Sequence, residues 1–185
     1  PDPKTPLDAT METMLRLKEE GKIRYIGISN FSLEGIIEAC RHAPVLTLQP
    51  HYSLLERSIE KEVMPLCTKK GVSILSYGSL GAGVLTGKYT ERPVFRRDDS
   101  RSYFYRFFRE ENWPRTMDVV NNLKDIAAGH DVKPGHVAIA WILAKEECPS
   151  AIVGARTPQQ VLDNLGGAGL VLSQDELAAL DRVSL

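Results

Sequence analysis

Amphipathic helices alternate with short apolar strands along this 185-residue chain. In the helical stretches apolar residues recur at helical spacing, as Leu7, Met11 and Leu15 do, whereas the strands are short and β-branched. Strands are predicted at 23–28, 45–48, 72–76 and 151–153. Helices are predicted from Pro6 to Gly21, after Ser32, from Ser58 to Lys70, from Thr116 to Gly129, from Pro134, from Pro158 to about Gly166, and after Ser173. Pro65 should kink the third helix or displace its start. This alternation predicts an α/β fold with a parallel sheet covered by helices.

Small and polar residues follow each of the four predicted strands. In a parallel sheet the carboxyl ends of the strands meet at one edge, where ligands bind. We therefore expect one site to be built from the four strand ends, Ser29-Asn30, Gln49, Tyr77-Gly78-Ser79 and Gly154-Ala155-Arg156.

The stretch from Gly71 to Lys88, GVSILSYGSLGAGVLTGK, joins a strand to a glycine-rich loop that ends in a cation. Backbone N–H groups can approach a phosphate closely where side chains are absent, and a lysine adds positive charge. A mobile loop that merely needs flexible residues would have the same composition. The pattern alone leaves both interpretations open.

Residues 89–116 are rich in arginine and aromatic side chains and are too long for an ordinary connection. They are either a lid over a site or a locally disordered segment. Basic residues interleaved with aromatics also occur in nucleic-acid-binding proteins, but the formal net charge of −1 argues against that class. We favour a lid whose rings pack on a cofactor or on the rim of the fold.

Composition and cysteine usage narrow the class of protein further. The length fits a single domain over 1–185, and no apolar run is long enough to cross a membrane. The three cysteines, Cys40, Cys67 and Cys148, are widely spaced, which favours buried thiols in a reducing, cytoplasmic setting. No spacing of ligand residues suggests a metal. His51 lies just beyond a strand end, from which it could approach a substrate, although the sequence favours no functional role for it.

Four segments in this order resemble the aldo-keto reductases: GKIRYIGISNF, LQPHYSLLER, YGSLGAGVLTGKY and IVGARTPQQVLDN. The resemblance covers the whole chain and is strongest to bacterial general-stress-protein-like members and to potassium-channel β-subunits. It implies a (β/α)8 TIM barrel that binds NADPH and reduces aldehydes and ketones. The chain would supply the second half of that barrel, strands five to eight with their helices.

The same resemblance implies roles for individual residues in holding NADPH. Tyr77 would stack on the nicotinamide ring, and Arg156 is the candidate for the 2′-phosphate. The nicotinamide carboxamide would be bound by Ser29, Asn30 and Gln49. The pyrophosphate would be bound by Gly78, Ser79, Leu80, Gly81, Ala82 and Lys88. The adenosine half would be bound by Gly154, Arg156, Gln160, Asp163 and Asn164. One arginine of the lid, from among Arg96, Arg97 and Arg101, would also contact the cofactor, and Arg97 is our candidate.

Some of these residues also have simpler interpretations. Gln160 fits a T-x-x-Q capping box with Thr157, and Asn164 could merely satisfy a helix end. Ser29-Asn30 could be only a turn and a helix cap. The family usually has serine and then proline after the stacking aromatic, where this chain has Gly78-Ser79, which puts that local contact in doubt.

No catalytic residue is assigned, because the family's catalytic tyrosine, aspartate, lysine and histidine precede the segment that begins with Pro1-Asp2-Pro3. A half barrel leaves two strand edges unpaired. We therefore expect a fragment that is inactive alone and whose open edges are covered by the N-terminal half of the barrel or by a second copy. The expected substrate is a small carbonyl compound. The alternative function is a non-catalytic nucleotide-binding or regulatory β-subunit-like module; a phosphate-binding barrel lyase or isomerase is disfavoured by the four motifs.

Overall fold

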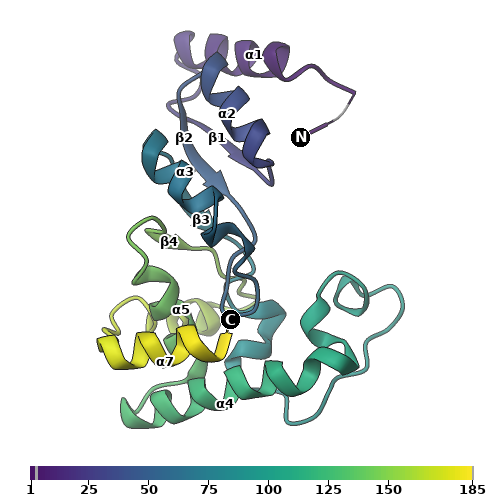
Figure 1. The fold of residues 1–185 in the computed structure, drawn as a ribbon, viewed down its shortest axis with the longest axis vertical. Coiled ribbons are helices and arrows are strands. Elements are labelled where there is room, and N and C mark those ends of the chain that lie inside the picture. Colours follow the sequence, from purple (N-terminus) through teal and green to yellow (C-terminus); the bar gives the residue numbers. More distant parts are fainter. Residues whose placement is uncertain (3, 185) are drawn as a thin grey trace.

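The computed structural model describes residues 1–2 and 4–184 and alternates helices with parallel strands (Figure 1). The strands are β1 (Ile26–Ser29), β2 (Val45–Gln49), β3 (Ser73–Ser76) and β4 (Ser150–Ala151). The helices are α1 (Leu7–Glu19), α2 (Leu33–His42), α3 (Val63–Lys70), α4 (Trp113–Gly129), α5 (Pro134–Leu143), α6 (Pro158–Leu165) and α7 (Gln174–Ser184). Every predicted helix and strand is present, with ends displaced by a few residues. Pro3 and Leu185, which belong to the predicted 1–185 domain, lie outside the described residues.

The four strands form one sheet in the order β1-β2-β3-β4, and each neighbouring pair is parallel. Ile28 pairs with Leu48, and Leu48 pairs with Ile74. Parallel neighbours need a crossover connection, and helices supply it here. The predicted parallel sheet is therefore confirmed.

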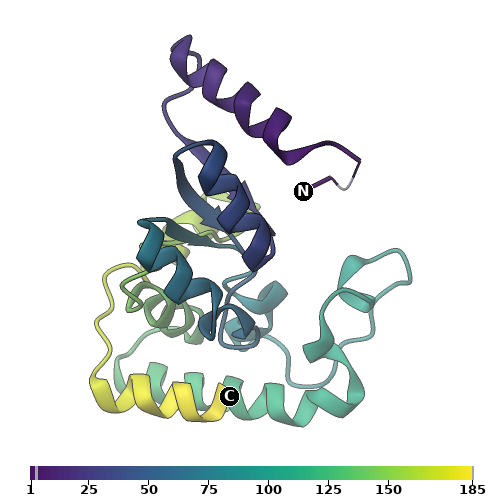
Figure 2. The same cartoon turned by 45° about the horizontal axis from the view of Figure 1, so that its top comes forward.

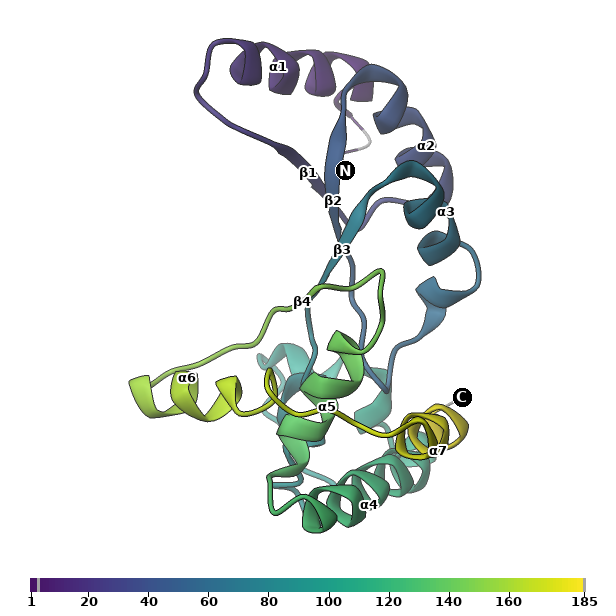
Figure 3. The ribbon, with the colours of Figure 1, turned by 90° about the vertical axis from the view of Figure 1, so that its left-hand side faces the viewer.

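The two faces of the sheet differ in burial. Ile26, Ile28, Leu48 and Ile74 are buried, and α2 and α3 lie along one side of the strands (Figure 3). Several alternate positions are polar and only partly covered, among them Ser29, Gln49 and Ser73. Because side chains alternate across a strand, this arrangement places one apolar face against helices and directs a polar face away from them.

Local signals set the ends of several helices. Ser32 accepts a hydrogen bond from the Gly35 N–H and caps α2, and Ser173 and Glu176 form the predicted reciprocal capping box before α7. The helix expected over 58–70 is interrupted. A short 3-10 turn covers Ser58–Glu60, and α3 starts only at Val63. Pro65 then lies in the first turn of α3, where its missing N–H leaves no hydrogen bond unmade.

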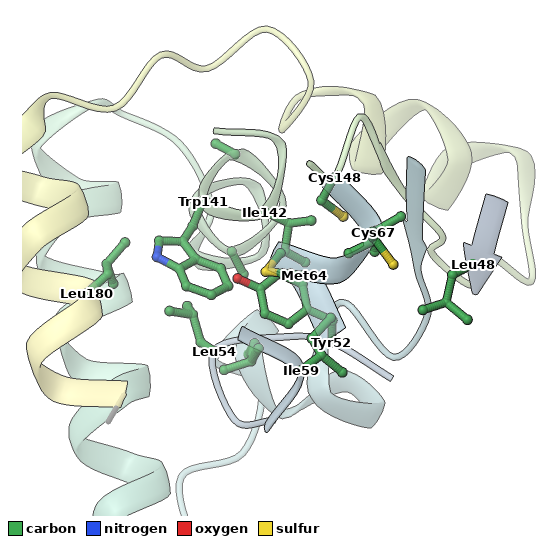
Figure 4. Packing of buried hydrophobic residues seen from close by; sticks show 14 of the residues in the cluster. Leu48, Tyr52, Leu54, Ile59, Met64, Cys67, Trp141, Ile142, Cys148 and Leu180 are labelled. Carbon is green, nitrogen blue, oxygen red and sulfur yellow. The ribbon is translucent and has the colours of Figure 1, made fainter. Parts of the chain in front are cut away.

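The largest side chains of the core gather between α5, α7 and the chain that follows β2. Figure 4 shows Trp141 beside Tyr52, with Leu180 and Leu54 nearby, and the two ring centroids are 5.4 Å apart. All three cysteines are free; Cys67 and Cys148 are buried as predicted, and Cys40 is half-buried. Burial raises the pKa of the Cys67 thiol to about 11.

Residues 89–112, here called the lid segment, contain three 3-10 turns and project beside α4 (Figures 1 and 2). Helix α4 begins at Trp113, so the last four residues of the predicted lid over 89–116 form the first turn of that helix. Phe107 and Phe108 are buried. Their rings contact each other, with centroids 5.0 Å apart, and Phe108 also contacts Phe95 at 4.8 Å. The segment is thus locally ordered by its own aromatic side chains.

Candidate functional site

The carboxyl ends of β1, β2 and β3 bring four predicted residues together. The Ser29 hydroxyl donates to the Gln49 carbonyl oxygen at 2.8 Å, and the Asn30 N–H donates to the same oxygen at 3.3 Å. The Tyr77 hydroxyl donates to the Asn30 side-chain oxygen at 3.2 Å. The Gln49 carboxamide makes no hydrogen bond with the described residues, so its donor and acceptor are available to a ligand amide.

His51 lies directly against the ring of Tyr77. The ring centroids are 5.3 Å apart and the planes are inclined by only 13°, and the two residues form an isolated parallel bridge. Burial lowers the pKa of His51, an effect that the carboxylate of Glu56 partly opposes. The only local signal for this contact is that His51 follows Gln49 by two residues, which places both side chains on the same face of an extended chain.

The loop after β3 adopts an unusual backbone. Gly81, Ala82 and Gly83 are consecutive residues with φ of 54°, 50° and 92°. Among the described residues, the N–H groups of Ser79, Leu80 and Ala82 find no acceptor. Free amides that lie close together in a loop with left-handed backbone can bind an anion, which fits the predicted phosphate loop.

The hydroxyl of Ser79 is engaged by the protein itself. Its side chain is buried and donates to the Ile152 carbonyl oxygen at 3.0 Å. The hydroxyl also lies 3.2 Å from that of Ser76. These bonds fasten the start of the loop to the chain after β4, and they leave only the Ser79 backbone N–H for an anion.

Lys88 places its charge beside the same loop. A Cβ atom added to Gly83 would lie 2.7 Å from the Lys88 ammonium nitrogen, so the absence of a side chain lets the lysine approach. The ammonium also lies over the Tyr89 ring, 4.9 Å from its centroid. Lys88 forms no ion pair within residues 1–2 and 4–184, and its charge remains available to a phosphate.

The predicted adenosine-binding residues lie in the turn after β4 and in α6. The Gln160 side-chain oxygen accepts from the Arg156 N–H at 2.6 Å, and the Asn164 amide donates to the Gly154 carbonyl oxygen at 3.4 Å. Gln160 thus completes only half of the predicted capping box: its N–H donates to Thr157, but its side chain serves Arg156. Both side chains hold the turn against α6.

Asp163 faces α5 in this structure. Its carboxylate accepts from the Lys133 ammonium at 2.5 Å and lies 3.5 Å from the His136 ring nitrogen. The hydrogen bond from Lys133 lowers the pKa of Asp163. Asp163 therefore positions α6, whereas the Arg156 guanidinium is exposed and makes no hydrogen bond or ion pair with the described part of the chain.

The three candidate arginines of the lid segment differ in their partners. Arg96 pairs with Asp98 at 3.1 Å, and Arg101 pairs with Asp99 at 2.5 Å. The hydrogen bonds from Arg101 lower the pKa of Asp99 to about 2, with a smaller contribution from Arg156. Arg97 has no acidic partner among the described residues, so its charge is the one available to a ligand.

An apolar hollow of about 310 Å³ lies away from these strand ends. It is bounded by α5, α6 and the edge strand β4, and its lining includes Ile139, Val161 and Leu165. Val161 and Leu165 are more than half exposed. This side of the molecule carries apolar surface beside an unpaired strand edge.

Residues 1–2 and 4–184 contain no group of three acidic, histidine or cysteine side chains placed to hold a metal ion. In the same residues no helix has both the length and the apolar character needed to cross a membrane.

The chain resembles known proteins in sequence over almost its whole length. The sequence profile of the Aldo/keto reductase family matches residues 1–185. The aldo-keto reductase str7 of Strobilurus tenacellus is 35% identical over 99% of this chain and 55% of its own length. The aldo-keto reductase YhdN of Bacillus subtilis (strain 168) is 40% identical over 87% of this chain and 49% of its own length.

A solved structure shares the fold as well. The glycerol dehydrogenase AKR11B4 from Gluconobacter oxydans superposes with a TM-score of 0.90 and 34% identity, over 99% of this chain and 55% of that one. The chain spans about half the length of the curated relatives it matches.

Proposed function

Because the chain belongs to the aldo/keto reductase family, we propose that it forms the nicotinamide-nucleotide-binding part of an oxidoreductase that reduces aldehydes or ketones to alcohols. One observation carries this proposal. Carboxamide, hydroxyl and aromatic groups meet at the carboxyl edge of the parallel strands, next to a loop whose backbone amides lack acceptors. An elongated ligand with an amide at one end and phosphates in the middle matches that order of groups.

At the nicotinamide end, the free Gln49 carboxamide would pair with the ligand carboxamide, assisted by Ser29 and Asn30. His51 covers one face of Tyr77, so the nicotinamide ring would stack on the other face. NADPH, when bound, supplies the hydride for the carbonyl carbon. The residues of this chain orient the ring that carries it.

The phosphate-binding part comprises the loop and the nearby cations. The amides of Ser79, Leu80 and Ala82 would donate to the pyrophosphate, and the left-handed backbone at Gly78 and Gly81 shapes the loop that presents them. Lys88 and Arg97 add unpaired positive charge. The adenosine half would lie on Gly154, Arg156, Gln160, Asp163 and Asn164, with Asp163 holding α6 through Lys133.

The choice of NADPH over NADH rests on Arg156. Relatives differ in their names: one is the NADH-specific methylglyoxal reductase of Escherichia coli (strain K12), 31% identical, and another is aldo-keto reductase yakc [NADP(+)] of Schizosaccharomyces pombe, 32% identical. An exposed guanidinium without a carboxylate partner suits a 2′-phosphate, because arginine binds phosphate with two parallel hydrogen bonds. We therefore propose NADPH as the preferred cofactor.

The remaining strands of a (β/α)8 barrel would complete the fold. Within the described residues, the edge strands β1 and β4 each pair on one side only, and apolar side chains lie exposed beside β4. We propose that the first half of the barrel, or failing that a second copy, covers these edges and supplies the catalytic groups. The 185 residues alone would then bind nucleotide without reducing a carbonyl substrate.

Titration of intrinsic tryptophan fluorescence with NADPH tests the proposal in the protein that contains these residues. Trp113 and Trp141 are the two reporters, and saturable quenching with energy transfer to the bound cofactor is the expected result. Absence of any saturable change up to a concentration on the order of 1 mM, equivalent to only about 4 kcal/mol of binding, would refute nucleotide binding.

A further inference from the structure

The imidazole of His51 is enclosed by aromatic rings from two separate parts of the chain. On one side it stacks on Tyr77, with ring centroids 5.3 Å apart. On another it meets two rings of the lid segment, Tyr105 at 5.6 Å edge-on and Phe104 at 6.2 Å. His51 thus links the end of β3 with the lid segment.

The same ring occupies the space that a side chain on residue 78 would need. A Cβ atom added to Gly78 would lie 2.5 Å from the Cδ2 atom and 2.6 Å from the Nε2 atom of His51. Both distances are far below van der Waals contact. The imidazole therefore packs on bare backbone at the first residue of the phosphate loop, immediately after Tyr77.

His51 makes these contacts with the face and edge of its ring. Its Nε2 atom is buried and has no hydrogen-bond partner in the described residues. A polar atom buried in this way costs stability, and such a cost is commonly retained at sites where function requires a particular group. Packing against three rings offsets part of that cost, since aromatic pairs contribute beyond their buried area.

We propose that His51 is a positioning residue, which holds the ring of Tyr77 in place and couples the lid segment to the nicotinamide platform. This inference rests on the proposed function, because it takes Tyr77 as the surface on which a nicotinamide stacks. Removal of the imidazole leaves Tyr77 with its hydroxyl bond to Asn30 but without support behind its ring. The rings of Phe104 and Tyr105 lose the group that they pack on.

Two ligands separate this role from ordinary packing. NADPH contains the nicotinamide, whereas 2′-phospho-ADP-ribose has the adenosine and pyrophosphate halves and lacks it. His51→Ala should raise the Kd for NADPH about threefold to tenfold, the worth of one aromatic pair, and leave the Kd for 2′-phospho-ADP-ribose within about twofold. His51→Phe restores a ring and should recover most of the NADPH affinity. Equal weakening for both ligands, or none for either, would overturn the proposal.

Limited trypsin digestion reads out the coupling to the lid segment independently of any ligand. The segment offers cleavage sites at Arg96, Arg97 and Arg106, among others. His51→Ala should accelerate cleavage there, and His51→Phe should restore protection. Unchanged cleavage in His51→Ala would contradict the coupling.

A second variant keeps the test decisive if His51→Ala does not fold. Phe104 is 54% exposed, so Phe104→Ala removes one lid ring at little cost to the core. It should weaken NADPH selectively, in the same direction as His51→Ala and to a smaller extent. Failure of the unsubstituted protein to bind either ligand would refute the proposed function itself, while the trypsin comparison would still decide whether His51 anchors the lid segment.

Discussion

The guanidinium of Arg57 lies 3.2 Å from the carboxylate of Asp181, which joins the chain after β2 to the last helix across 124 residues. The same guanidinium pairs with Glu60 at 2.7 Å and lies over the Trp141 ring. The Trp141 indole N–H donates to Asp181 at 3.0 Å. One buried arginine therefore fastens α7 and α5 to the segment that follows the site.

Replacing Arg57 by methionine should lower the free energy of unfolding by about 2–4 kcal/mol, because Glu60 and Asp181 would lose a partner that is only 12% exposed. Urea denaturation measures this loss. Arg41→Met is the matched control: its ion pair with Glu38 is as short, but the Arg41 side chain is 68% exposed, so about 0–1 kcal/mol is expected. Similar losses in the two variants would contradict the importance of burial.

Replacing Arg156 by alanine should weaken NADPH about tenfold to a hundredfold, the value of a charge-assisted hydrogen bond, and change NADH little. Fluorescence titration with the two cofactors measures the ratio of their Kd values. Arg96→Ala serves as control, because Arg96 is already paired with Asp98 in the lid segment. If both cofactors lose affinity equally in Arg156→Ala, the guanidinium does not recognise the 2′-phosphate.

Replacing Gly83 by alanine should weaken NADPH and NADH alike, since both contain the pyrophosphate. Residue 83 has φ of 92°, which strains any L side chain, and the added Cβ would meet the Lys88 ammonium at 2.7 Å. Isothermal titration calorimetry gives the two affinities. Gly169→Ala is the control, because a Cβ there meets no atom within 4 Å. Unaltered affinities in Gly83→Ala would show that the loop backbone is not the phosphate cradle.

The protonation of His51 should make stability depend on pH. Burial holds the pKa of His51 below its ordinary 6.5; the rings of Tyr77 and Tyr105 pack against the imidazole, and the Glu56 carboxylate favours its charged form. The unfolded chain therefore binds a proton first, and the free energy of unfolding should fall as pH drops below 6.5. His51→Phe should remove this part of the decline, as denaturation between pH 7.5 and about 5 would show. An NMR titration that places the His51 pKa above 6.5 would refute it.

Much of the fold could be read from the sequence because the signals are local. Apolar spacing identifies helices such as α2, and glycine or serine at helix ends fixes where they begin and stop. Polar residues directly after apolar strands, as at Ser29 and Gln49, locate the binding edge of a parallel sheet. These inferences need no knowledge of which strand lies beside which.

The contacts that could not be predicted depend on strand register and side-chain direction. Nothing local indicates that His51 bridges Tyr77, or that the ring fills the space above Gly78, where the family usually carries serine. The position of His51 explains why this chain has glycine at position 78: the imidazole occupies the space that a serine side chain would need. Likewise, nothing in the sequence indicates that Asp163 bonds to Lys133, and only the three-dimensional structure shows this contact.

The separation of Arg57 from Asp181 also has a kinetic consequence. During synthesis at about 5–20 residues per second, the guanidinium waits roughly 6–25 seconds for its partner on α7 to be made. Contacts between residues so distant in sequence form late, because the loop that they close must first be ordered. Until α7 docks, the Trp141 indole N–H lacks its acceptor on Asp181, so this part of the core is completed last.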